Sequence, residues 1–405
     1  GPTGSGKSTT LQVVISSLIT DADGKTHVIT VEDPPEYTIF GWESSLVQHT
    51  DALGNLIERD VKDDLGNLVY NDDGSVKRDS VINKKIKCFA TQTPVANAKT
   101  AEQRSAAFNS AISAAMRLDP DVIMIGEVRD SSSAAAALQA SMTGHQVFTT
   151  IHANNAITIF SRLIDIGAKK ELACDADVIC GLIAQRLVKK LCDNCSIDIK
   201  DHLHEIAKDE KKLSTFKRLL VAYNLYSTYE EIKHINSIEE LMKNVKTSEN
   251  NNVTDLTGVR IINHKGCAEC NYRGIKGRSV VAEIILTDDR YMELVLEEKK
   301  SELKDYWMKE LKGVDMVMHG LLKVKKGISD PFELEKELGY IEVYKNVDKD
   351  NFINILNDSE LETANILLNS NKYCDDFLKK YPQLQTNELQ NNTKPAKKTR
   401  KLTVK

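Results

Sequence analysis

The opening residues, GPTGSGKS, have the spacing of a phosphate-binding loop. Residues Gly1 to Ser8 fit the pattern GxxxxGK[ST], in which glycines let the backbone turn tightly so that consecutive N–H groups point at phosphate oxygens. In such a loop Lys7 reaches the β and γ phosphates and the Ser8 hydroxyl is a ligand of Mg²⁺. The stretch Thr9–Ile19 is predicted to be a helix whose N-terminal dipole adds to the anion site. The alternative is an ordinary Gly/Ser turn before a helix.

Acidic residues follow the next predicted strand. In HVITVEDPPEY, His27–Val31 is an apolar run typical of a buried strand, and it is followed by Glu32, Asp33 and Glu36. Carboxylates at the carboxyl end of a parallel strand lie where ligands bind in α/β folds. We therefore expect them to hold Mg²⁺ or its water ligands. The alternative is a solvated acidic turn shaped by the two intervening prolines.

A second short apolar strand, Asp121–Ile125, is followed by Gly126 and Glu127. In many phosphate-loop NTPases this strand ends in two acids, of which the first positions Mg²⁺ and the second polarises the attacking water. Here the first place is a glycine, so Glu127 is the candidate general base and metal binding falls to Ser8 and the acidic residues above. The alternative is that Glu127 only pairs with Arg129 at the strand end.

Two histidines flank a third predicted strand, Gln146–Ile151, which follows an alanine-rich helix over Ser131–Met142. His145 stands at the start of the strand and His152 at its end. A histidine at the carboxyl end of a strand can contact the γ phosphate and couple hydrolysis to motion. The position favours a functional role for His152 more than for His145, although a single histidine is more often structural.

Two CxxC pairs, in LCDNC and GCAEC, indicate a metal site. Each pair offers two thiolates from a tight turn, so four sulfurs can close a structural tetrahedral Zn²⁺ site. The predicted zinc ligands are Cys192, Cys195, Cys267 and Cys270. The alternative is a set of redox-active or buried free thiols. The remaining cysteines stand singly and are interpreted as packing residues: Cys88, Cys174, Cys180 and Cys374.

The composition limits the class of protein. The chain has 405 residues, 41% of them hydrophobic, which is enough for two or three domains with real cores. No run approaches the roughly 18 apolar residues that cross a bilayer, and no signal peptide is visible. A net charge of −5 gives no overall attraction to nucleic acid. Eight cysteines without a secretory signal indicate a reducing compartment.

The ordered segments GPTGSGKSTT, VEDPPEY, DPDVIMIGEVRD, TGHQVFTTIHANNA and AQRLVKKLC resemble the ATPases of bacterial type II secretion and type IV pilus assembly. The resemblance covers a little over half the chain. It implies an α/β fold, with a RecA-like P-loop NTPase domain, an inserted tetracysteine zinc module and a helical C-terminal region. It also implies a homo-hexamer that hydrolyses ATP on the cytoplasmic face of the inner membrane, where it acts on a platform protein and touches the membrane only peripherally.

The resemblance assigns roles to the residues that match the family motifs. It implies catalytic roles for Glu127, Lys7, His152 and Glu32. The residues implied to bind ATP and Mg²⁺ are Gly1, Pro2, Thr3, Gly4, Ser5, Gly6, Lys7, Ser8, Thr9, Glu32, Asp33, Glu36, Glu127, His145 and His152. Family members also carry an N-terminal domain that supplies base contacts and arginines in trans. Since a phosphate loop normally follows a buried strand, we expect a truncated sequence with a strand and a further domain before Gly1.

We predict four regions along the chain. Residues 1–190 form the ATPase domain, with a polar insertion at about 41–87 that is expected to form a β-hairpin or meander. Residues 191–286 form the zinc module, with a helical, partner-binding insertion at 196–264. Residues 287–385 are helical, and the basic tail 386–405 is expected to be disordered, either solubilising the chain or touching anionic lipid or nucleic acid.

The leading hypothesis is an ATP-driven motor for type IV pilus assembly or type II-like export. A conjugative type IV secretion ATPase is a close alternative, against which the zinc pairs argue. A RecA-like DNA translocase is an alternative from a different class, although nucleic acid is an unlikely partner at this net charge. A non-hydrolysing structural subunit is a further alternative, and the retained Glu127 argues against it.

Overall fold

A computed structural model describes residues 1–48, 59–60, 68, 70–71, 75–79, 81–95, 100–245, 255–343, 352–353 and 355–356. The tail predicted at 386–405, residues 357–385 of the region predicted to be helical, and Cys374 lie outside these residues. Within the described part of the chain, no helix is both long and apolar enough to cross a membrane.

The centre of the fold is a four-stranded parallel sheet in the order β6-β1-β7-β8. The strands are β6 (Thr91–Pro94), β1 (Val28–Glu32), β7 (Val122–Ile125) and β8 (Gln146–Thr149). β1 and β7 are buried along their whole length, as expected for parallel strands that are covered on both faces. The predicted α/β fold with a parallel sheet is confirmed. β1 ends one residue later than predicted, so Glu32 belongs to the strand.

Helices cover both faces of this sheet: α1 (Lys7–Asp21) on one, and α2 (Ala101–Ala115) and α3 (Ser131–Met142) on the other. The alternation of side chains along the strands divides the core accordingly. Val28, Val122 and Met124 pack with residues of α1. Ile29 and Ile123 belong instead to the larger core, which also contains residues of α2, α3 and α4 (Thr158–Asp165).

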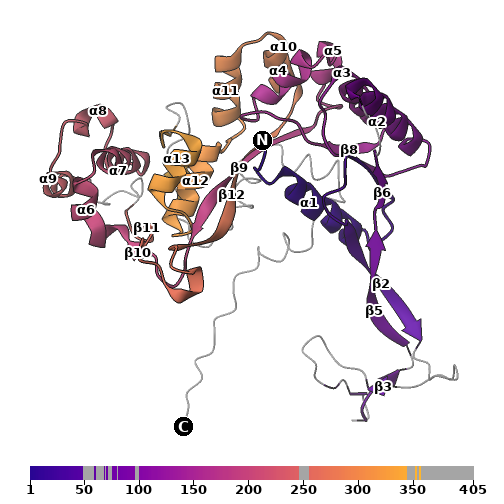
Figure 1. The fold of residues 1–405 in the computed structure, drawn as a ribbon, viewed down its shortest axis with the longest axis horizontal. Helices are drawn as coiled ribbons and strands as arrows, with labels where there is room; N and C mark the ends of the chain where they lie inside the picture. The colour runs from indigo at the N-terminus through magenta and orange to yellow at the C-terminus, as the bar shows by residue number, and fades with distance from the viewer. Residues whose placement is uncertain are drawn as a thin grey trace.

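Two long strands at the ends of the predicted polar insertion pair with each other. β2 (Phe40–Gln48) and β5 (Val81–Phe89) form an antiparallel ribbon that extends away from the sheet, with β3 (Arg59–Asp60) and β4 (Arg78–Asp79) near its far end (Figure 1). Cys88 packs against the core beside α1, as predicted, and its thiol also donates a hydrogen bond to Glu43 Oε2 at 2.9 Å. That contact raises the pKa of the Cys88 thiol.

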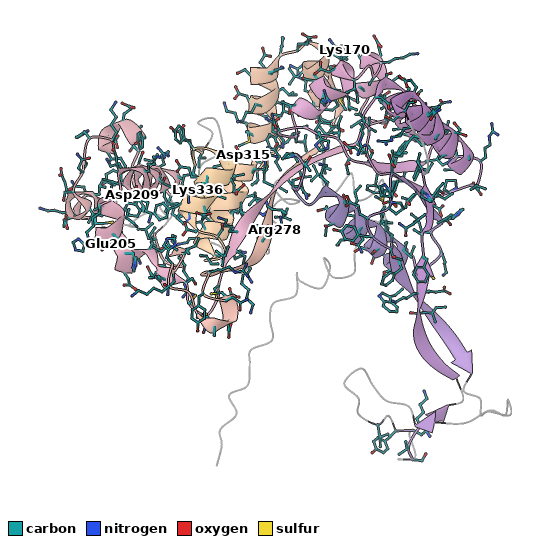
Figure 2. All side chains as sticks on the ribbon, viewed as in Figure 1. Lys170, Glu205, Asp209, Arg278, Asp315 and Lys336 are labelled. Atoms are coloured by element: carbon teal, nitrogen blue, oxygen red, sulfur yellow. The ribbon has the colours of Figure 1, made fainter. Side chains whose placement is uncertain are left out.

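A second antiparallel ribbon, β9 (Gly181–Leu191) with β12 (Ile275–Leu286), connects the sheet to the rest of the chain (Figure 1). Between these strands lie short elements and helices that form a separate group. They are β10 (Ile197–Asp198), η1 (Ile199–His202), α6 (Leu203–Ala207), α7 (Glu210–Ala222), α8 (Tyr229–Ile232), α9 (Ile238–Lys243), β11 (Arg260–Ile261) and η2 (Ala268–Cys270). Glu205 and Asp209 mark this group in Figure 2, while Lys170 marks α5 (Lys170–Ala173) on the sheet side.

The region after the ribbon is helical in its described part, as predicted. α10 (Asp289–Leu296) and α11 (Lys300–Lys309) are separated at Glu298, whose φ of 57° is left-handed. α12 (Met316–Lys325) and α13 (Pro331–Leu338) follow and pack beside the ribbon. Tyr291 in α10 and Trp307 in α11 are both buried in the core.

Gly41 fixes the position of the β2–β5 ribbon on α1. A Cβ at this position would lie 2.6 Å from the Ile19 Cβ. We predict that Gly41→Ala lowers the free energy of unfolding by about 1–3 kcal/mol, because overpacking forces backbone shifts. Thermal or denaturant unfolding measures the change. Gly181→Ala is the matched control, because its Cβ would meet its nearest atom only at 3.7 Å, and an equal loss in both variants would contradict the prediction.

Candidate functional site

The phosphate-loop motif adopts a shape that suits an anion. Gly4 and Gly6 have φ values of +77° and +87°, which other residues adopt only with strain. Ser5 Oγ is buried without a hydrogen-bond partner in the described part of the chain. The Lys7 ammonium donates to the carbonyl oxygens of Gly1 at 2.8 Å and Pro2 at 3.0 Å. An unpaired buried hydroxyl, a glycine-rich turn and a lysine folded across it fit a bound phosphate group.

The charges of two carboxylates act on the Lys7 ammonium. Burial lowers the pKa of Lys7, and Arg186 acts in the same direction, while Glu127 and Glu36 oppose them. The two acidic residues thus lie near enough to act on the lysine, although one follows β7 and the other follows β1. An added phosphate would strengthen this favourable negative field around the lysine.

Glu127 and His152 are brought into direct contact. β7 and β8 are parallel neighbours, with Ile125 opposite Thr149, so the residues that follow them meet at one edge of the sheet. The His152 Nε2 atom lies 2.9 Å from Glu127 Oε1. The other oxygen, Oε2, accepts a hydrogen bond from Arg129 Nε at 2.8 Å. Glu127 therefore has the predicted pairing with Arg129 on one carboxylate oxygen and an unpredicted contact with His152 on the other.

The three acidic residues after the first strand do not form a single cluster. Glu32 is 6% exposed, and its Oε1 accepts hydrogen bonds from Thr30 Oγ1 at 2.6 Å and Gln92 Nε2 at 3.0 Å. Asp33 instead faces α2, where Arg104 Nε lies 3.3 Å from its Oδ2. Glu36 is the member that acts on Lys7. Glu32 is thus held rigidly inside the strand, whereas the other two lie outside it.

The structure separates His145 from the other candidate residues. It precedes β8 and so lies at the amino edge of the parallel sheet, whereas His152 lies at the carboxyl edge. Its Nδ1 lies 3.2 Å from the Ala140 carbonyl oxygen and 3.1 Å from Thr143 Oγ1, at the end of α3. These contacts place it at a helix end, and we leave His145 out of the proposed nucleotide site.

Two residues of β9 also belong to the site, although they were not among the predicted site residues. Gln185 is 3% exposed; its Nε2 donates to the Ser5 carbonyl at 2.8 Å, and its Oε1 accepts from Thr10 Oγ1 at 3.0 Å. Arg186 Nη2 donates to the Asn154 carbonyl at 2.9 Å. Both residues lie in the segment AQRLVKKLC that carries the family resemblance, where they form a polar pair within an apolar run.

The four predicted zinc ligands come together at the end of the β9–β12 ribbon. Their sulfurs all lie within 4.8 Å of one another, and three of the pairs are 3.8 Å apart: Cys192–Cys267, Cys195–Cys270 and Cys267–Cys270. Tetrahedral Zn²⁺ with Zn–S bonds of about 2.3 Å requires S···S separations of about 3.8 Å, whereas a disulfide requires about 2 Å. The cluster therefore fits a metal ion.

Backbone N–H groups favour a thiolate within this cluster. The N–H groups of Cys267 and Gly274 each donate to Cys270 Sγ at 3.2 Å. The first of these bonds is the larger cause that lowers the pKa of Cys270 to about 6, against the opposing effect of burial. A sulfur that is negatively charged near neutral pH is the form that binds Zn²⁺.

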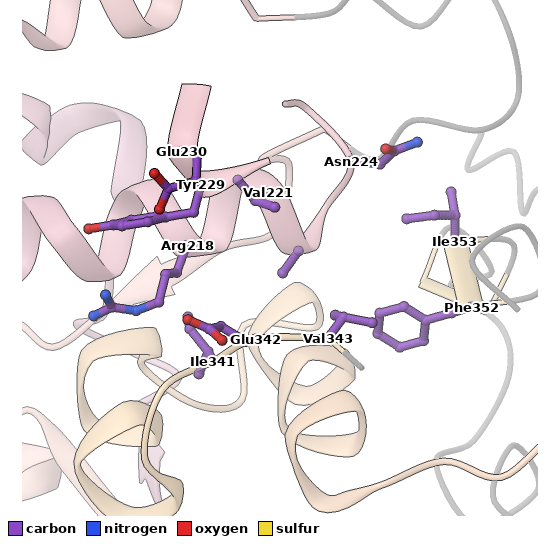
Figure 3. A pocket seen from close by; sticks show the side chains of 11 residues that line it. Arg218, Val221, Asn224, Tyr229, Glu230, Ile341, Glu342, Val343, Phe352 and Ile353 are labelled. Carbon is purple, nitrogen blue, oxygen red and sulfur yellow. The ribbon is translucent and has the colours of Figure 1, made fainter. Parts of the chain in front are cut away.

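Two cavities adjoin the described elements. One of about 400 Å³ lies beside the phosphate loop, and its lining includes Pro2, His152, Asn154, Thr158 and Arg162. The other, of about 340 Å³, lies between α7 and residues 341–343 and 352–353 (Figure 3). Arg218 in the second cavity already pairs with Glu335 and donates to Ser214 Oγ at 2.9 Å. Arg218 therefore connects α7 to α13. The first cavity is the one that belongs to the candidate site, because Pro2 and His152 line it.

The sequence matches the family described as type II/IV secretion system protein over residues 1–71 and 89–347. The chain therefore belongs to this family of secretion and pilus proteins. It is 27% identical over 333 residues to the type II secretion system ATPase E of Vibrio cholerae, covering 81% of this chain and 45% of that relative. It is 28% identical over 229 residues to the type IV pilus assembly ATPase PilB of Thermus thermophilus, covering 56% and 21%.

Among solved structures, the Legionella pneumophila ATPase DotB matches with a TM-score of 0.43 and 19% identity, covering 83% of this chain and 57% of that one. The chain spans less than half the length of both curated relatives.

The cysteine cluster leads to a prediction about metal content. We expect the freshly purified, reduced protein to contain one Zn²⁺ per chain, measured by elemental analysis, and Cys270→Ser to lower that content sharply because a ligand is lost. Cys180→Ser is the matched control, since Cys180 is a free thiol outside the cluster. Protein that contains no metal although its thiols are reduced would refute the zinc assignment.

Proposed function

We propose that this chain is the motor part of an ATP-hydrolysing hexamer that powers type IV pilus assembly or type II-like protein export. The observation that carries the proposal is the Glu127–His152 contact at the sheet edge beside the phosphate loop. Membership of the type II/IV secretion system family supports a role in secretion or pilus assembly. The proposed partner is an inner-membrane platform protein, and the proposed location is the cytoplasmic face of that membrane.

In this proposal each residue has a defined task. The phosphate loop and Lys7 bind the β and γ phosphates of ATP. Ser8, with the acidic residues near the loop, holds Mg²⁺, which when bound neutralises charge that develops on the phosphates. Glu127 accepts the proton of the attacking water. His152 orients the Glu127 carboxylate through its Nε2 contact and lies close enough to the loop to respond to the γ phosphate.

Arg129 limits when Glu127 can act. Both Glu127 oxygens have partners in the structure, so neither is free to contact the attacking water. We propose that Glu127 gives up one of these contacts when substrate enters. The side chain of Arg129 is 55% exposed, so it is the partner that can move away without leaving a buried charge unpaired.

The zinc site is proposed to be structural. Its four sulfurs would fill a tetrahedral coordination sphere, which leaves no open position for a water or a substrate. Its task is then to hold the end of the β9–β12 ribbon and the two ends of the helical insertion together.

We predict that Glu127→Gln lowers ATP turnover by roughly 100-fold or more, because general-base catalysis contributes about this much, while Mg·ATP still binds. The measurement combines phosphate release with nucleotide binding on the natural protein that contains this sequence. Glu171→Gln, at an exposed position of α5, is the control and should be fully active. Equal ATP turnover by the wild type and by Glu127→Gln would refute the role of Glu127 as general base.

A second measurement separates the protein-export motor from a DNA translocase. We expect turnover to rise when membranes that contain the platform protein are added, and to be unchanged by DNA over a range of salt concentrations. The net charge of −5 gives no overall attraction to nucleic acid. Salt-dependent DNA binding with DNA-stimulated turnover would favour the translocase instead.

A further inference from the structure

The β9–β12 ribbon presents different residues on its two faces. Gln185 is paired with Ala282, and Ala184 is paired with Glu283. Residues that pair across antiparallel strands share a face, and successive residues along a strand alternate between faces. Gln185 therefore lies on one face, whereas Glu283 and Arg186 lie on the other.

The Gln185 face holds the phosphate loop. The two hydrogen bonds of Gln185 to Ser5 and Thr10 connect it to both the loop and the first turn of α1. The loop lies directly on the strand, since a Cβ at Gly6 would be 3.2 Å from Gln185 Nε2 and 3.5 Å from Leu187 Cδ2. The position of the phosphate-binding backbone thus depends on this face of β9.

The Glu283 face holds the loop that carries His152. Glu283 is 5% exposed and accepts a short hydrogen bond from the Ala156 N–H. It also accepts from the N–H of Met316 at the start of α12. Arg186 donates a hydrogen bond to the Asn154 carbonyl of the same loop. Burial raises the pKa of Glu283 to about 7, and Asp315, whose charge acts in the same direction, marks this junction in Figure 2.

We propose that Gln185 and Glu283 are positioning residues that set the phosphate loop and the His152 loop at a fixed separation on opposite faces of one ribbon. The inference rests on the proposed ATPase function and adds to it. Neither residue touches the reacting atoms. Gln185 acts on nucleotide binding through Ser5, and Glu283 acts on the chemical step through the loop that orients His152 against Glu127.

The test compares two variants, one of which should change mainly KM and the other mainly kcat. Gln185→Leu leaves the buried Ser5 carbonyl without its donor, so we expect roughly a ten-fold weaker affinity for Mg·ATP and a matching rise in KM, with kcat within about two-fold of wild type. Glu283→Ala frees the Ala156 N–H, so we expect kcat to fall roughly ten-fold with little change in KM. If Glu283→Ala does not fold, Glu283→Gln takes its place, because a neutral amide oxygen is a weaker acceptor for the Ala156 N–H than a carboxylate.

Two controls at the ion pair between Lys189 in β9 and Glu333 in α13 report a purely structural effect. Lys189→Met lies on the Gln185 face, and Glu333→Gln is a buried glutamate whose partner is Lys189, at the other end of the ribbon. Both should lower thermal stability while KM and kcat stay at wild-type values.

If the Gln185 and Glu283 variants lose stability but keep both kinetic constants, or if every variant lowers kcat in proportion to its stability, the positioning roles are refuted. A wild-type protein that does not hydrolyse ATP would refute the proposed function, and nucleotide affinity would then still test Gln185 by itself.

Discussion

The parallel pairing of β1, β7 and β8 is the constraint on which the candidate site depends. Val31 lies opposite Ile125, which in turn lies opposite Thr149, so three strands end at the same level. A polar group lies at that edge at the end of each strand: the acidic residues for β1, Glu127 for β7 and His152 for β8. A shift of one residue in either pairing would turn alternate side chains toward the wrong face of the sheet. The apolar side chains that fill both cores hold this register, so burial far from the site determines its geometry.

The sequence predicted the residues whose signals are local. Strands, the helix Ser131–Met142 and the paired cysteines each depend on a pattern within a short window, and their elements lie close to where the patterns place them, although β8 ends at Thr149 and not at Ile151. The exact end of β1 was missed, because an acid after an apolar run indicates a turn unless a partner is known, and Gln92 is 60 residues away. Gln185 was missed for the same reason, since Ser5 lies 180 residues before it.

The helical insertion depends on a buried ion pair rather than on apolar packing alone. Arg218 in α7 pairs with Glu335 in α13, with side chains only 9% and 12% exposed, and the Arg218 guanidinium lies 4.4 Å from the Tyr340 ring centre. Removing one member of a buried pair leaves an uncompensated charge, which is strongly destabilising. The insertion is therefore docked against the C-terminal helices, and the cavity in Figure 3 lies at this contact.

The chain leaves the β9–β12 ribbon at Cys192 and returns to it after Cys270, and the Cys192 N–H donates to the Gly274 carbonyl at 3.1 Å. The two ends of the segment between them are thus already adjacent, whatever lies in that segment. The entropy of closing a loop grows only slowly with its length, by about 0.6 kcal/mol for each doubling. Relatives of this chain can therefore lengthen, shorten or replace the inserted helices while the strands that reach the nucleotide site keep their register, which makes this point of the fold a natural place for new binding surfaces to arise.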